Sequence, residues 1–147
     1  MWRKIRKVLK WLLILLAAVI LLGIIVNAVC RLLARPKLQD AYGQAVTVDG
    51  KSMRVDIKGD QANPVIILLS GYGCASPVLE LEPLAVALSQ DYCVVTIEPF
   101  GYGLSDQTDQ DRTIDKIVQE LHTCVETLGY EEYYLMGHSI GGLYSLY

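Results

Sequence analysis

The sequence is poor in residues that bind metals. Its 147 residues include four cysteines and two histidines, with no CxxC pair and no metal-ligand spacing to His122 or His138. We therefore expect no metal centre, and nothing in the sequence implies a cofactor. The four cysteines are expected to be mainly small buried apolar side chains: Cys30, Cys74, Cys93 and Cys124. Two alternatives stay open, a Cys93–Cys124 disulfide in a domain outside the cell and a reactive Cys74.

Acidic residues are absent from the first 37 positions. This region holds eight basic side chains: Arg3, Lys4, Arg6, Lys7, Lys10, Arg31, Arg35 and Lys37. All 16 acidic residues come later, so residues 38–147 carry a net charge of −11. An acidic domain argues against nucleic acid as a partner and against broad contact with anionic lipid.

Charge is missing altogether from residues 11–30, WLLILLAAVILLGIIVNAVC. Twenty helical residues span roughly 30 Å, the thickness of a bilayer's hydrocarbon core. The run therefore predicts a transmembrane helix, with the lipid bilayer as its partner. Five basic residues precede it and three follow, which predicts a single-pass cell-membrane protein with residues 1–10 as a basic cytoplasmic flank and the following domain outside the cytoplasm.

The segment after the apolar run and the length of the run bear on whether it is an uncleaved anchor. Residues 31–43 are predicted to be a juxtamembrane linker, with breaks at Pro36 and Gly43. A cleaved signal peptide is the alternative to an anchor. Its apolar core is usually about 7–15 residues long, which is shorter than the run found here.

Residues 44–147 contain no internal repeat, and their pattern predicts one α/β domain. Two alternating runs flank Asp49-Gly50, which indicates a β-hairpin. Further strands are expected at residues 63–70, 92–98 and 133–137, and helices at 77–89, 114–128 and 140–147. A hairpin followed by alternating strands and helices predicts a mostly parallel sheet of about five strands with helices on its faces. Ser76 and Thr113 are the expected N-caps of the first two helices.

The last strand leads into Gly137-His138-Ser139-Ile140-Gly141, the G-x-S-x-G pattern of an activated serine. Such a serine sits on a sharp strand-to-helix turn at a strained positive φ, so its neighbours must be small. Gly137 and Gly141 meet this demand. The adjacent Gly142 would ease packing of the helix against the sheet.

An oxyanion formed at Ser139 needs two backbone donors. One is expected to be the N–H of Ile140, at the start of the helix after the serine. The other should come from the loop after the third strand, where the sequence reads LLSGYG. Gly71 and Gly73 let this backbone approach a substrate closely, and the N–H of Tyr72 is the predicted second donor.

Four segments together resemble the N-terminal half of an α/β-hydrolase of the serine-hydrolase branch. They are LLSGYG, IEPFGYGLSD, RTIDKIVQELH and LMGHSIGG, within residues 45–147. The resemblance implies an eight-stranded fold, of which this chain would be a truncated form, and a triad in the order serine, acid, histidine. A serine nucleophile disfavours the dehalogenase and epoxide-hydrolase branches, which use aspartate. Many relatives have His-Gly where this chain has Ser70-Gly71, so the support of the loop is expected to differ.

The base and the acid of the triad are not expected within this chain, because the family places them after later strands. His138 should point away from the hydroxyl of Ser139, and His122 should be structural. Three acids near the site are interpreted as turn or loop supports: Glu98, Asp106 and Asp109. The strand ending at Gly137 should lie at a sheet edge, and residues 38–147 alone should be poorly soluble and inactive.

The sequence thus predicts a membrane-anchored serine hydrolase that transfers an acyl group to water. Its partner would be a small ester, thioester or peptide substrate. The alternative is a non-catalytic, membrane-tethered pseudoenzyme or fragment, since no base for Ser139 is apparent.

Overall fold

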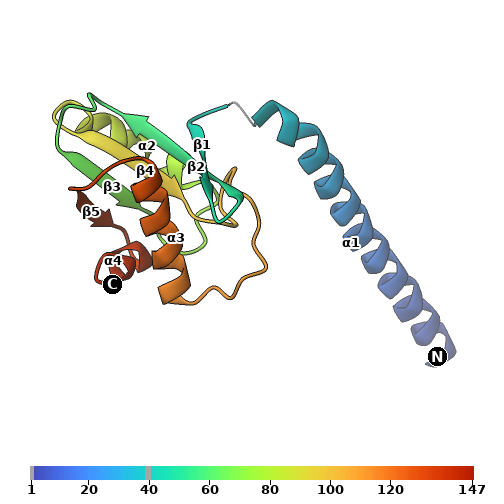
Figure 1. The fold of residues 1–147 in the computed structure, drawn as a ribbon. Coiled ribbons are helices and arrows are strands. Elements are labelled where there is room, and N and C mark those ends of the chain that lie inside the picture. The colour runs from blue at the N-terminus through green and yellow to red at the C-terminus, as the bar shows by residue number, and fades with distance from the viewer. Residues whose placement is uncertain (1, 39–40) are drawn as a thin grey trace. The chain divides into compact units, whose positions relative to one another are not determined.

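The structure is a computed structural model that describes residues 2–38 and 41–147, with the side chains of residues 34–38 excluded (Figure 1). The chain forms two separate units, an N-terminal helix and a domain that follows it. Each unit is described by itself below.

The N-terminal unit is the helix α1 (Trp2–Leu38), which is 37 residues long. Residues Trp2–Leu33 are long and apolar enough to cross a membrane, with a mean hydropathy of 3.0 in the most apolar window. The predicted break at Pro36 is wrong, because the helix continues through the first part of the expected linker. The segment RLLAR at residues 31–35 consists of strong helix formers. Pro36 lies in the last turn, where only one helical hydrogen bond is lost.

The domain is built on one sheet of five strands, as the sequence predicts. The strands are β1 (Gln44–Val48), β2 (Lys51–Lys58), β3 (Val65–Leu69), β4 (Cys93–Glu98) and β5 (Tyr134–Gly137). Their order in the sheet is β1-β2-β4-β3-β5. β1 and β2 pair in an antiparallel manner, as do β2 and β4, whereas β4, β3 and β5 run parallel. The expected edge position of the strand that ends at Gly137 is confirmed.

The predicted hairpin at Asp49-Gly50 is present. Val48 pairs with Lys51, which leaves a loop of two residues. Both loop residues have positive φ, 49° at Asp49 and 76° at Gly50. Such angles belong to the type I′ turn, whose twist matches that of the flanking strands.

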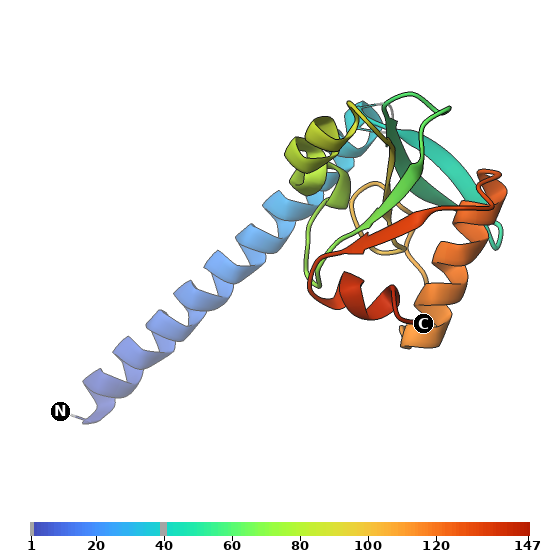
Figure 2. The ribbon, with the colours of Figure 1, turned by 90° about the vertical axis from the view of Figure 1, so that its left-hand side faces the viewer.

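Helices cover both faces of the sheet (Figure 2). α2 (Pro77–Leu88) packs on one face, where its Ala85 forms a core with Ile66, Leu68 and Val94 of the sheet. α3 (Ile114–Thr127) lies on the other face, over a larger core that also receives Tyr144 of α4 (Ile140–Tyr144). The central strands β3 and β4 are buried throughout, in agreement with their continuous apolar runs.

The helix ends follow local signals. The Oγ of Ser76 accepts a hydrogen bond from the N–H of Leu79, and the Oγ1 of Thr113 accepts one from Lys116, so both predicted N-caps are confirmed. α4 is shorter than expected, since it ends at Tyr144 rather than at residue 147. Its segment IGGLYS contains two glycines and a serine, which are weak helix formers.

The cysteines are all unpaired, so the disulfide left open between Cys93 and Cys124 is not formed. Both of these side chains are fully buried, which agrees with their predicted role as small apolar residues.

Candidate active site

Ser139 lies between β5 and α4 in a conformation that few side chains adopt. Its φ is 55° and its ψ is −121°. Among the described residues other than glycine, only Ser139 and the hairpin residue Asp49 have positive φ. Backbone strain of this kind is characteristic of functional turns, and the predicted sharp turn from strand into helix is present at this serine.

The space around this turn explains the neighbouring glycines. A Cβ at Gly137 would come within 2.2 Å of the backbone of Gly141, and a Cβ at Gly141 within 2.5 Å of the carbonyl oxygen of Leu69. Both contacts are with backbone, which cannot shift as easily as the end of a flexible side chain. A Cβ at Gly142 would lie 3.6 Å from the nearest atom, an ordinary contact. The turn therefore requires glycine at positions 137 and 141. At position 142 there is room for a methyl group, so close packing of the helix does not depend on a glycine there, contrary to the expectation from the sequence.

The loop after β3 lies directly beside the serine. The N–H of His138 donates to the carbonyl of Leu69 at 2.9 Å, which ties the turn to the end of β3. A Cβ at Gly71 would be 3.4 Å from the Cβ of Ser139 and 3.0 Å from Nδ1 of His138. The predicted nucleophile and the predicted oxyanion loop are thus adjacent, although they are almost 70 residues apart in the sequence.

The two predicted oxyanion donors border the same cavity. The N–H groups of Tyr72 and Ile140 have no hydrogen-bond partner among the residues that the structure describes. Both residues line a cavity of about 540 Å³. Its other walls come from the loop after β3, the loop after β4, α3 and α4: Ser70, Gly71, Gly73, Cys74, Ala75, Pro99, Phe100, Gly101, Tyr102, Gln107, Thr108, Arg112, Ile117 and Tyr144.

Comparison with known proteins identifies the family. Residues 64–147 match the model of the alpha/beta hydrolase fold. The chain belongs to the α/β-hydrolase family. Over 145 residues it is 31% identical to "Uncharacterized protein YbdG" of Bacillus subtilis, covering 96% of this chain and 44% of that protein. Over 81 residues it is 38% identical to "Putative carbamate hydrolase RutD" of Escherichia coli, covering 54% of this chain and 30% of that protein.

Solved structures agree with this assignment. An epoxide hydrolase from Vigna radiata has a TM-score of 0.62 and 26% identity, over 69% of this chain and 32% of its own. An enol-lactonase from Burkholderia xenovorans has a TM-score of 0.63 and 23% identity, over 69% and 39%. This hydrolase chain spans less than half the length of the curated relatives it matches.

Glu98 organises both loops of the hydrolase cavity. Its carboxylate is fully buried at the end of β4. It accepts hydrogen bonds from Ser76 Oγ at 2.7 Å, from the N–H of Leu104 at 2.7 Å and from the N–H of Val78 at 3.3 Å. Ser76 follows the oxyanion loop and Leu104 lies in the loop after β4, so one carboxylate connects the two walls of the cavity. The predicted role of Glu98 as a loop support agrees with these contacts.

Tyr42 is a member of this cluster that the sequence did not predict. Its hydroxyl donates to Oε1 and Oε2 of Glu98 at 3.1 and 3.2 Å and lies 3.0 Å from Ser76 Oγ. Burial is the main cause that raises the pKa of Tyr42 above its usual value. The residue falls within the expected linker, and the only sequence signal is its aromatic ring in a short polar stretch. The segment after α1 is therefore bonded to the base of the candidate active site.

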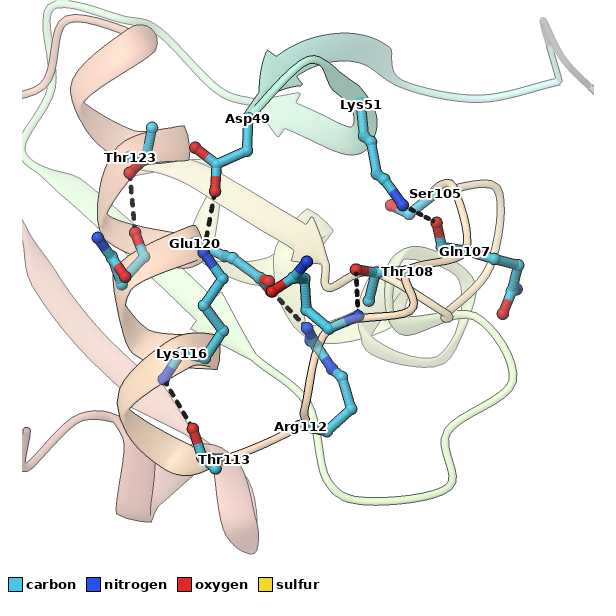
Figure 3. A network of polar contacts seen from close by, with 12 residues as sticks. Asp49, Lys51, Ser105, Gln107, Thr108, Arg112, Thr113, Lys116, Glu120 and Thr123 are labelled. Atoms are coloured by element: carbon cyan, nitrogen blue, oxygen red, sulfur yellow. Dashed lines mark hydrogen bonds and ion pairs between the residues drawn. The ribbon is translucent and has the colours of Figure 1, made fainter.

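Arg112 and Glu120 form a second polar pair beside the cavity (Figure 3). Nη1 of Arg112 lies 2.7 Å from Oε2 of Glu120. The carboxylate of Glu120 is on α3 and its side chain is only 2% exposed, whereas that of Arg112 is 32% exposed. Sequence reasoning missed this pair, because eight residues separate its members and the first lies before the helix.

Cys74 is part of the cavity wall, but its environment does not activate it. Burial and the nearby carboxylate of Glu80 raise the pKa of its thiol to about 11. A thiol with this pKa is almost fully protonated at neutral pH, and the thiolate is the reactive form. The possibility of a reactive Cys74, left open above, is therefore not favoured.

The remaining residues singled out from the sequence lie on α3, in the loop after β4 and next to Ser139. His122 is exposed on α3 and lies 3.4 Å from Glu126. Asp106 is a turn support, since Oδ2 accepts from the N–H of Ser52 at 2.8 Å, and Asp109 is exposed in the same loop. Neither His138 nor His122 makes a hydrogen bond to Ser139 within the described part of the chain.

Proposed function

We propose that this chain is the nucleophile-bearing part of a membrane-anchored serine hydrolase. Ser139 attacks an acyl carbonyl, and the N–H groups of Tyr72 and Ile140 stabilise the oxyanion that forms. A histidine and an acid from the remaining part of a longer protein would complete the triad. The observation that carries the proposal is the strained turn at Ser139 beside two unpartnered N–H groups.

Each step of the reaction has a defined proton balance. The proton of the serine hydroxyl passes to the histidine as the oxygen bonds to the acyl carbon. The histidine then protonates the leaving alcohol, thiol or amine. In the second half of the reaction the histidine takes a proton from water as the water oxygen bonds to the acyl carbon, and it returns this proton to the serine oxygen as the acid is released. The substrate class is accordingly a small ester, thioester or amide. The carbamate named for RutD belongs to the same group of acyl compounds.

A serine-specific assay tests this proposal. The longer protein that contains this chain should hydrolyse a p-nitrophenyl ester, and Ser139→Ala should reduce kcat/KM by at least 1000-fold, on the order expected for loss of a nucleophile. Ser145→Ala is the matched control, because Ser145 lies just after the same short helix and its hydroxyl donates to the carbonyl of Gly141. Equal hydrolysis by the wild type and Ser139→Ala would contradict the role of Ser139, and a wild type without hydrolysis would support the non-catalytic alternative.

Membrane attachment is a separate part of the proposal. The apolar stretch of α1 and the excess of basic residues before it support an anchor whose N-terminus lies in the cytoplasm. Alkaline carbonate washing should leave the protein in the membrane fraction. Alkaline phosphatase fused after Tyr147 should be active, since it folds only outside the cytoplasm. Release by carbonate or an inactive fusion would contradict the anchor or its orientation.

A further inference from the structure

We propose that Arg112 binds a carboxylate on the substrate, so that this hydrolase prefers acyl groups whose far end is anionic. The inference rests on the proposed function and adds a substrate class to it. It follows from the position of one charged side chain in the cavity beside Ser139.

Arg112 is the one formally charged side chain among the described residues that line the cavity. It lies at the end of the loop after β4, one residue before the N-cap of α3. The oxyanion donors Tyr72 and Ile140 line the same space. A substrate bound at these donors therefore shares its cavity with a guanidinium group.

The guanidinium is held in place and still has free donors. Its Nη1 is engaged by Glu120 at 2.7 Å. No second acceptor bonds to Arg112 in the part of the chain that the structure describes. A guanidinium has five N–H donors in a rigid plane, and it binds carboxylates in a bidentate manner. The remaining donors are thus available to a ligand.

Of the ion pair between Arg112 and Glu120, the positively charged Arg112 faces the cavity. Glu120 is nearly inaccessible, at 2% exposure, while Arg112 is 32% exposed and forms part of the wall. A ligand in the cavity therefore approaches the guanidinium more closely than the carboxylate. The net negative charge of the domain opposes anions only at long range, where salt screens it over about 10 Å. Within the cavity the nearby guanidinium therefore favours an anionic ligand over a neutral one.

Part of the cavity wall is apolar. Phe100 and Ile117 line the cavity and are 3% and 8% exposed. Tyr144 adds a hydroxyl group, and burial raises its pKa, so it stays neutral at physiological pH. A monoester of a dicarboxylic acid matches this arrangement, with its ester carbonyl at the oxyanion donors, its methylene chain on the apolar wall and its carboxylate at Arg112.

A binding measurement on the 147-residue chain in lipid nanodiscs tests the inference without requiring hydrolysis. Monomethyl adipate is the anionic probe and dimethyl adipate is its neutral counterpart, which differs by one methyl group. Calorimetry should show that the chain binds the monoester at least tenfold more tightly than the diester. Arg112→Gln should abolish this difference, and Arg112→Lys should keep part of it. An unchanged ratio in Arg112→Gln would overturn the inference.

Two further variants separate recognition from stability and from net charge. Arg112→Gln leaves Glu120 buried without its partner and can destabilise the fold, so Arg112→Gln/Glu120→Gln provides a neutral pair in the same place. It should also lose the preference. Lys116→Gln removes a cation from α3 that pairs with Asp49 at the surface and does not line the cavity. It should keep the preference, and its loss there would mean that only overall charge matters.

The reaction of the longer protein distinguishes this inference from the proposed function. If the monoester is hydrolysed with higher kcat/KM than the diester, and Arg112→Gln lowers that ratio at least tenfold, both stand. Hydrolysis of both esters without such discrimination overturns the role of Arg112, while the proposed function as a serine hydrolase still holds. Selective binding by the chain without any hydrolysis supports Arg112 as an anion-binding residue while the proposed function fails.

Discussion

The backbone conformation of Ser139 depends on Gly137 and Gly141, which are closely surrounded by backbone, whereas Gly142 is not. Gly141→Ala places a methyl group 2.5 Å from the carbonyl oxygen of Leu69, so the backbone must shift. We expect a loss of about 1–3 kcal/mol in the free energy of unfolding, as for other overpacked sites. The strained φ of Ser139 should relax with it, which would also lower any esterase activity of the longer protein.

Gly142→Ala is the matched control for that substitution. Its methyl group meets only an ordinary contact at 3.6 Å, and alanine favours a helix over glycine by about 1 kcal/mol. Stability should therefore be unchanged or slightly higher. Urea denaturation followed by the near-ultraviolet dichroism of tyrosines measures both, because the two tryptophans lie in α1. Equal losses at the two positions would refute the steric explanation.

Cys74 offers a test of the electrostatics of the cavity wall. With its pKa at about 11, only about one thiol in a thousand is ionised at pH 8. Alkylation by iodoacetamide should be slow at pH 8 and should accelerate tenfold per pH unit until the pH approaches 11. Cys30→Ser removes the exposed cysteine that would otherwise react first. A rate that levels off below pH 9 would contradict the burial of the thiol.

At the scale of elements, the two N-caps have unequal importance. Thr113→Ala removes one capping bond at an exposed position and should cost about 1 kcal/mol. Ser76→Ala also removes a donor from the buried carboxylate of Glu98, and an under-satisfied buried charge costs about 1–3 kcal/mol more. Urea midpoints should therefore fall further for Ser76→Ala. Equal midpoints would show that Glu98 does not depend on Ser76.

The elements themselves could be predicted from the sequence, because their signals are local. The hairpin at Asp49-Gly50, the caps and the apolar strands each depend on a few adjacent residues. The strained turn at Ser139 also followed from its glycines. The contact of Tyr42 with Glu98 did not, because it forms only when segments 56 residues apart meet. The pair of Arg112 and Glu120 did not either, because Arg112 lies before the helix and no helical periodicity connects it to Glu120. The end of α1 differs from the sequence prediction because the helix formers before Pro36 extend the helix past the proline.

At the scale of the whole molecule, the edge strand β5 is the most exposed part of the sheet. Tyr134, Leu135 and Met136 are 65%, 44% and 41% exposed. By register, Tyr134 and Met136 share the sheet face of Ile66 and Leu68, which α2 covers only over the central strands. An apolar edge of this kind is a template for association between chains.

Residues 41–147 expressed without α1 should therefore aggregate at micromolar concentration. Met136→Lys should reduce this aggregation, because a charge on an edge strand opposes pairing with another chain. Val86→Lys, at an exposed position of α2, is the matched control. Size-exclusion chromatography compares the three proteins. A monomeric parent domain, or equal rescue by both substitutions, would contradict a role of the β5 edge.

The strand order β1-β2-β4-β3-β5 also determines when each strand can pair during synthesis. β3 is made before either of its neighbours, and it acquires its first partner only when β4 enters between it and β2. At a translation rate of about 5–20 residues per second, roughly 2–9 seconds separate the start of β4 from the end of β5. Both loops that Glu98 joins are therefore synthesised before Ser139 is added to the chain. The strained turn can thus form against the end of β3, a strand that was made about 70 residues earlier.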